Sequence, residues 1–145
     1  MIVTVTLNPS IDRTAPIAGP LRRGQVNRLG SSTEVAAGKG VNISRVLRGA
    51  GIETCAVVPA GAKGRLTLGL NHDDIPHQVV PVAAAVRTNL TITEPDGTTT
   101  KINEPGADLS PEELTAVEEA IVEKSSGAQW VVLSGSLPPG VPTHW

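Results

Sequence analysis

The chain has 145 residues, of which 39% are hydrophobic and 18% charged, a composition typical of a globular domain and not of a disordered one. Its formal net charge of -2 argues against nucleic acid as the main partner. No apolar run reaches the length of a membrane span, and the single Cys55 cannot form an intrachain disulfide, so we expect a cytoplasmic protein without a membrane partner.

Strand and helix signals alternate along the first third of the chain. Residues 1–7 are apolar and β-branched, which predicts a strand that ends at Asn8-Pro9. Residues 17–34 contain several turn signals and fit short strands or an excursion from the main body. A glycine-lysine-glycine turn at 38–40 then leads into a predicted helix that Gly51 ends. The helical periodicity is given by the apolar residues Ile43, Val46, Leu47 and Ala50.

The middle of the chain predicts a strand, a helix and a hairpin. Residues 54–58 read as a buried strand in which Cys55 is a small hydrophobe, and a helix follows at about 64–73. Two threonine-rich strands, 88–93 and 98–102, flank a Glu-Pro-Asp-Gly turn. Proline presets φ in such a turn and glycine takes positive φ, so these residues predict an antiparallel hairpin.

The last third predicts a capped helix and a buried strand. Ser110 and Glu113 form a capping box with proline at the first helical position, and Gly127 ends that helix. Its buried stripe is Leu114, Val117 and Ile121. Residues 130–133 form an unbroken apolar run, as expected for a parallel strand covered on both faces. The alternation of strands and helices therefore predicts an α/β layered domain with a mostly parallel sheet.

Three segments are expected to meet where ligands bind in such sheets, beyond the carboxyl ends of the strands. They are residues 8–12, the glycine turn and residues 134–136. The turn offers backbone N–H groups, a helix N-terminus and the cation of Lys39 to a small anion. It is neither a P-loop, which needs glycine where Thr33 stands, nor a dinucleotide loop, which needs glycine at Ile43. The turn predicts a phosphorylated or polyhydroxylated ligand, and the alternative is an ordinary turn that caps a helix. The histidines show no metal-ligand spacing.

Four motifs in this order resemble those of the ribokinase-like sugar kinases of the phosphofructokinase B type, above all 1-phosphofructokinase and tagatose-6-phosphate kinase. The motifs are Thr6 to Asp12, Ala37 to Asn42, Val86 to Asn89, and Leu133 to Gly140. The likeness spans essentially the whole chain but only the N-terminal part of the family pattern. It implies a ribokinase-like fold in which residues 1–145 are the N-terminal part of a carbohydrate kinase domain.

The resemblance assigns candidate substrate-binding residues. The carboxylate of Asp12 is expected to accept hydrogen bonds from sugar hydroxyls, and Arg28 and Arg87 are candidates for binding a substrate phosphate. The sugar site is expected to include Gly38, Lys39, Gly40 and Asn42. Further candidates are Asn89, Lys101, Ser134 and Ser136, for which a solvent-facing strand position or a helix cap is the alternative.

The resemblance also implies a small β-sheet, the lid, from segments 13–34 and 86–104. In this family the lid covers the sugar site and often forms a homodimer, and its physical sense is exclusion of water. The alternative is that the threonines of these strands simply form a face exposed to solvent.

One part of the family pattern has no counterpart here. The catalytic aspartate lies in a Gly-Ala-Gly-Asp motif, and residues 106–108 are only a superficial echo of it. ATP and Mg²⁺ are implied by resemblance, but the nucleotide-binding half is not found. We therefore expect a truncated kinase or a fragment, inactive alone, with an open sheet edge at residues 130–132. Alternatives are a non-catalytic sugar-phosphate binding module and an interaction protein that dimerises through the lid.

Overall fold

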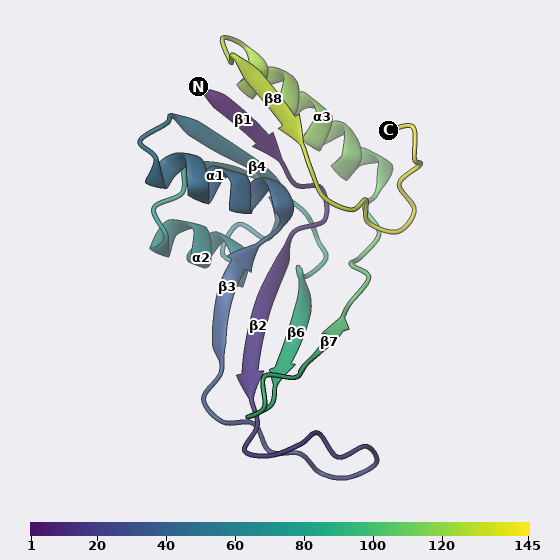
Figure 1. Ribbon diagram of the computed structural model, residues 1–145. Helices are drawn as coiled ribbons and strands as arrows, with labels where there is room; N and C mark the ends of the chain where they lie inside the picture. The colour runs from purple at the N-terminus through teal and green to yellow at the C-terminus, as the bar shows by residue number, and fades with distance from the viewer.

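Two four-stranded sheets form the framework of the protein, which a computed structural model describes over residues 1–145 (Figure 1). The first, the core sheet, has the strand order β5-β4-β1-β8, and all its neighbours are parallel. Its strands are β1 (Ile2–Val5), β4 (Thr54–Ala60), β5 (His77–Pro81) and β8 (Trp130–Leu133). The mostly parallel sheet predicted from the alternating pattern is therefore present.

The second sheet, the lid sheet, extends away from the core in the order β3-β2-β6-β7 (Figure 1). Its strands are β2 (Ser10–Pro16), β3 (Thr33–Ala37), β6 (Arg87–Thr93) and β7 (Thr99–Asn103). The central pair β2 and β6 is parallel, whereas both outer pairs are antiparallel. The predicted hairpin is confirmed as β6 and β7, with Gly97 at φ 89° in its turn.

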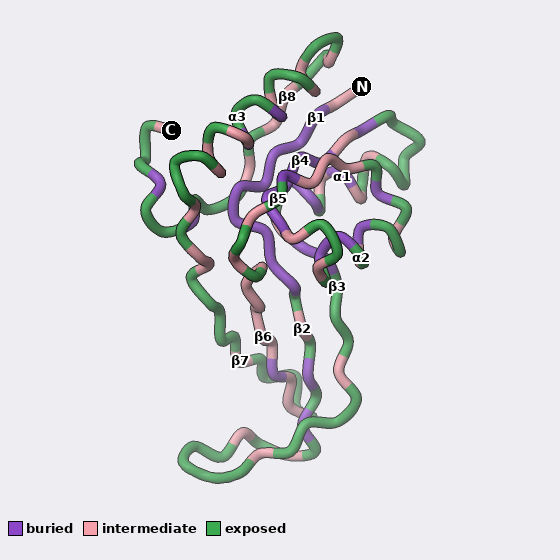
Figure 2. The backbone as a smooth tube through the Cα atoms, turned by 180° about the vertical axis from the view of Figure 1, so that it is seen from behind, coloured by how far each residue is buried: buried purple, intermediate pink, exposed green.

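Helices cover the two faces of the core sheet. The helices α1 (Lys39–Gly49) and α2 (Arg65–His72) lie on one face and α3 (Pro111–Ser125) on the other. Successive residues of β4 divide between the two cores: Ala56 and Val58 pack with the α1 and α2 side, and Val57 packs with α3. In Figure 2 the buried residues concentrate in the core strands, while the outer lid is largely exposed. No helix has the length and apolar character needed to cross a bilayer.

A chain of buried hydroxyl groups fixes α1 on the sheet. The Thr4 and Ser44 hydroxyls are 2.8 Å apart, and Ser44 is 2.9 Å from the hydroxyl of Thr54. Thr54 donates in turn to the carbonyl of Ile2 at 3.0 Å. Because buried hydroxyls are costly unless they are hydrogen-bonded, this chain favours one position of α1 over the sheet.

Several predicted elements are confirmed at close to their expected bounds. The capping box that starts α3 is complete: Glu113 N–H donates to the Ser110 hydroxyl and Ser110 N–H donates to the Glu113 carboxylate. Cys55 lies half-buried in β4, where burial raises the pKa of its thiol. The lid sheet is wider than the segments 13–34 and 86–104, since β2 begins at Ser10 and β3 runs to Ala37.

The structure corrects several expectations. The strand β5 was not predicted, and β2 and β3 were expected only as parts of the lid segment 13–34. The buried face of α1 is formed by Val41 and Ser44, whereas Val46 is 72% exposed. The expectation that β8 is covered on both faces is wrong, because the side chains of Trp130 and Leu133 are 67% and 59% exposed. The strand also pairs only with β1 and lies at the edge of the sheet. This is the open edge that the incomplete family pattern led us to expect.

Candidate functional site

A polar cleft of about 220 Å³ lies where the core sheet meets the lid sheet, and no hydrophobic residue lines it. Its walls come from the segment after β1, the start of β2, the turn before α1, the start of β6 and the segment after β8. The lining residues are Asn8, Ser10, Asp12, Gly38, Lys39, Asn42, Arg87, Asn89, Gly135 and Ser136. The cleft thus joins the three segments that were expected to converge.

One wall is a two-by-two block of side chains on the lid sheet. The parallel register of β2 and β6 pairs Ser10 with Arg87 and Asp12 with Asn89. Since alternate residues of a strand share a face, all four side chains lie on the same face of this sheet. Asp12 is exposed to the cleft, whereas Ser10 beneath it is buried.

The opposite wall is the glycine turn, and threonine packing explains why it needs glycine. Gly38 has φ 134°, and a Cβ atom there would lie 2.5 Å from the Thr6 methyl group. A Cβ on Gly40 would lie 2.5 Å from Thr6 Oγ1, the atom that accepts the Val41 N–H at 3.1 Å. The turn is therefore pressed onto β1, which directs the N-terminus of α1 and the exposed Lys39 toward the cleft.

Asn42 faces the cleft from the first turn of α1 with its amide already half engaged. Its Oδ1 accepts a hydrogen bond from Arg45 at 2.7 Å, and Arg45 also binds the Asp73 carboxylate of α2 at 3.0 Å. This contact orients the amide. Its NH₂ group and the second lone pair of its oxygen remain free, so Asn42 can donate and accept hydrogen bonds in the cleft.

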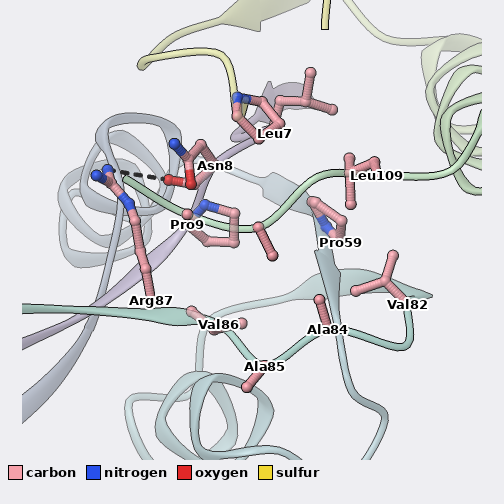
Figure 3. Close-up of a pocket in the computed structure, with 13 residues that line it drawn as sticks. Leu7, Asn8, Pro9, Pro59, Val82, Ala84, Ala85, Val86, Arg87 and Leu109 are labelled. Atoms are coloured by element: carbon pink, nitrogen blue, oxygen red, sulfur yellow. Dashed lines mark hydrogen bonds between the residues drawn. The ribbon is translucent and has the colours of Figure 1, made fainter. Parts of the chain in front are cut away.

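Arg87 stands at the joint between the sheets (Figure 3). Its guanidinium donates to the carbonyl of Glu104 at 3.1 Å and to that of Asn8 at 3.3 Å, and it has no carboxylate partner. A cavity of about 30 Å³, lined by Leu7, Pro59 and Val86 among others, lies beside it. Arg87 therefore connects the segment after β1 with the segment after β7 through these two hydrogen bonds. No neighbouring carboxylate neutralises its positive charge.

Most of the predicted substrate-binding residues meet in this cleft, but four do not. Gly40 lies buried beneath the turn and serves its packing, and Ser134 lines a separate hollow beside β8. Lys101 lies exposed on β7 opposite Thr91. Arg28 lines a hollow of about 460 Å³ in the loop at the far end of the lid, so within one chain it does not reach the cleft.

Three cleft residues were not among the predicted set. Asn8 was placed in the segment 8–12 but not named as a site residue, yet its amide donates to the Pro105 carbonyl at 3.0 Å and lies 3.3 Å from the Ser136 hydroxyl. Ser10 carries a signal that was overlooked, because it lies two residues before Asp12 in an extended segment and so shares its face. Gly135 was part of the segment 134–136, but only its two serine neighbours were predicted to bind the substrate.

Comparison with known proteins follows this geometry. A match to the pfkB family carbohydrate kinases covers residues 5–145. The chain belongs to this family. It is 32% identical over 145 residues to the 1-phosphofructokinase of Vibrio cholerae and 36% identical over 143 residues to that of Xanthomonas campestris. Each match covers 97% of this chain but only 44% and 45% of the respective relative.

Solved structures show the same fold. Phosphofructokinase-2 from Escherichia coli in complex with fructose-6-phosphate superposes with a TM-score of 0.88 at 32% identity, covering 97% of this chain and 47% of that one. A possible 1-phosphofructokinase from Thermotoga maritima gives a TM-score of 0.84 at 31% identity, covering 98% and 47%. The ribokinase-like fold is therefore shown, and the chain spans less than half the length of the relatives it matches.

Proposed function

We propose that this chain binds a sugar phosphate as the substrate-binding part of an ATP-dependent sugar-phosphate kinase of the 1-phosphofructokinase type. The observation that carries the proposal is the cleft, which has a carboxylate on the lid wall, two cations, several amides and no apolar residue. A ligand that matches it has hydroxyl groups at one end and an anionic group at the other.

Different residues of the cleft suit the two ends of that ligand. Asp12 is an acceptor and binds hydroxyl donors of the sugar. Lys39 and Arg87 bind the phosphate, the arginine through the N–H groups that its carbonyl partners leave free. The NH₂ group of Asn42 and the N-terminus of α1 add further donors for oxygen atoms of the ligand.

Transfer of a phosphoryl group needs more than the cleft supplies. Asp12 is its only carboxylate and we assign it to the hydroxyl groups. Residues 1–145 hold no group of three or more His, Cys, Asp or Glu side chains placed to bind a metal ion. Phosphoryl transfer relies on positioning and on stabilisation of the transferring phosphate. We therefore propose that the groups that bind ATP lie outside residues 1–145 and that this chain alone does not catalyse phosphoryl transfer.

Two further proposals concern alternatives and assembly. A non-catalytic sugar-phosphate binding module accounts for the same cleft, and it differs from a kinase part in gaining no turnover when a C-terminal half is supplied. We also propose a homodimer through the lid sheet, as the family resemblance implies. The cytoplasmic location expected from the sequence stays a prediction.

Isothermal titration of the 145-residue chain tests the proposed function. Fructose 6-phosphate, fructose 1-phosphate and tagatose 6-phosphate are compared with fructose, and at least one phosphorylated sugar is expected to bind more tightly. Asp12→Asn and Arg87→Ala should each weaken that binding by about tenfold or more, whereas Lys101→Ala, outside the cleft, should leave it unchanged. ADP release with ATP is measured in parallel and should be absent. Equal binding of phosphorylated and plain sugar would contradict the proposal, and turnover would refute the proposed inactivity.

A further inference from the structure

We propose that Ser10 and Asn89 are positioning residues that hold Asp12, so that a single carboxylate oxygen is presented to the ligand. This inference rests on the proposed function and concerns the hydroxyl-binding wall of the cleft. It replaces the direct ligand contact expected for Asn89 from the sequence with an indirect role.

The three side chains form a closed ring of hydrogen bonds. The Ser10 hydroxyl donates to Asp12 Oδ1 at 2.8 Å. The Asn89 amide nitrogen donates to the same Oδ1 at 3.0 Å and to the Ser10 hydroxyl oxygen at 3.1 Å. The ring crosses from β2 to β6 through the register that pairs Asp12 with Asn89.

The count of donors and acceptors decides which atoms remain for a ligand. The Ser10 hydroxyl oxygen and Asp12 Oδ1 are only 2.8 Å apart, so one side of the Asn89 amide nitrogen faces both, and the amide Oδ1 is buried without a partner. Ser10 is 2% exposed and its hydroxyl proton is committed to Asp12. Ser10 therefore has no free donor to offer the cleft, and the Asn89 amide is directed at Asp12, so both side chains act on the ligand through Asp12.

Asp12 is correspondingly divided into a held oxygen and a free one. Oδ1 accepts two hydrogen bonds from the ring, while Oδ2 has no partner within the protein. A carboxylate fixed in this way keeps its free oxygen in one place before the ligand arrives, which lowers the entropic cost of binding. The ring should thus strengthen binding of the hydroxyl-bearing part of the ligand and leave its phosphate unaffected.

Titrations with two probes separate this role from a direct contact. Fructose 6-phosphate carries both parts of the ligand, and inorganic phosphate carries only the anion. We expect Asn89→Ala and Ser10→Ala each to weaken fructose 6-phosphate binding by roughly five- to tenfold and to change phosphate binding by less than about twofold. Asn103→Ala is the matched control, because Asn103 lies exposed opposite Asn89 on β7 but outside the cleft. It should change neither affinity.

The double variant gives the deciding result. If Asn89 acts through Asp12, then Asn89→Ala adds no further loss in an Asp12→Ala background. Losses that multiply, or an Asn89→Ala chain that binds like the wild type, would overturn the inference while the proposed function stands. A wild-type chain that binds inorganic phosphate but none of the three sugar phosphates would overturn both. Thermal unfolding is followed for every variant, and Asn89→Thr, which suits a strand, replaces Asn89→Ala should the latter unfold.

Discussion

Replacing Gly40 by alanine is expected to destabilise the fold, although the family likeness placed this glycine at the sugar. The added Cβ would lie 2.5 Å from Thr6 Oγ1 and 2.8 Å from the backbone carbonyl oxygen of Val5. A backbone carbonyl in the middle strand of a sheet cannot move aside cheaply, so α1 must shift. Such overpacking costs about 1–3 kcal/mol. At about 3 °C per kcal/mol for a chain of this size, the melting temperature should fall by about 3–9 °C.

Gly49 supplies the matched control, because it lies at the other end of the same helix and nothing is within 4 Å of a Cβ placed there. Gly49→Ala should leave the stability unchanged or raise it by up to about 1 kcal/mol through better helix propensity. The assay is thermal unfolding followed by far-UV circular dichroism. Equal melting temperatures for Gly40→Ala and Gly49→Ala would refute the argument that β1 leaves no room for a side chain at position 40.

Two further predictions concern acid stability and association. The backbone N–H groups of Ser110 and Ala83 hold the pKa of Glu113 below its usual 4.5, so its contribution to stability is present above that value and is lost as the pH falls below it. Glu113→Gln should therefore reduce the loss of stability between about pH 6 and about pH 3, measured by urea unfolding; an unchanged loss would contradict this account. Ile102→Lys on the lid should shift sedimentation velocity profiles toward monomer, whereas a shift caused by Trp130→Lys and not by Ile102→Lys would place the self-association at the open β8 edge instead.

Local chemistry made the hairpin, the capping box and the apolar strands predictable. Each depends on residues close in sequence, such as the Ser110 and Glu113 pair that caps α3. The strand β5 was missed because its apolar part is Val79-Val80, a run too short between Pro76 and Pro81 to indicate a strand by itself. The glycine turn was found, but its packing against Thr6 depends on β1 and could not be predicted from local sequence.

The sequence predicted which segments form the candidate site but not the contacts between its side chains. The register that places Asn89 opposite Asp12 joins strands far apart in sequence, and sequence patterns do not give that register. The same is true of the Arg45 contact that orients the Asn42 amide. Arg28 was assigned from the family resemblance, and the path of the lid loop carries it away from the cleft of its own chain.

The parallel pairing of β2 with β6 has a consequence for the order of folding. The strands β1 and β4 with α1 between them use contacts of moderate sequence separation, whereas the cleft needs β6 to close onto β2 and residues 135–136 to arrive from the far end of the chain. Contacts between distant segments form late because closing long loops costs entropy. During synthesis the ligand site is therefore assembled only after nearly all of these residues have emerged, and ligand binding reports that the lid sheet has finished folding.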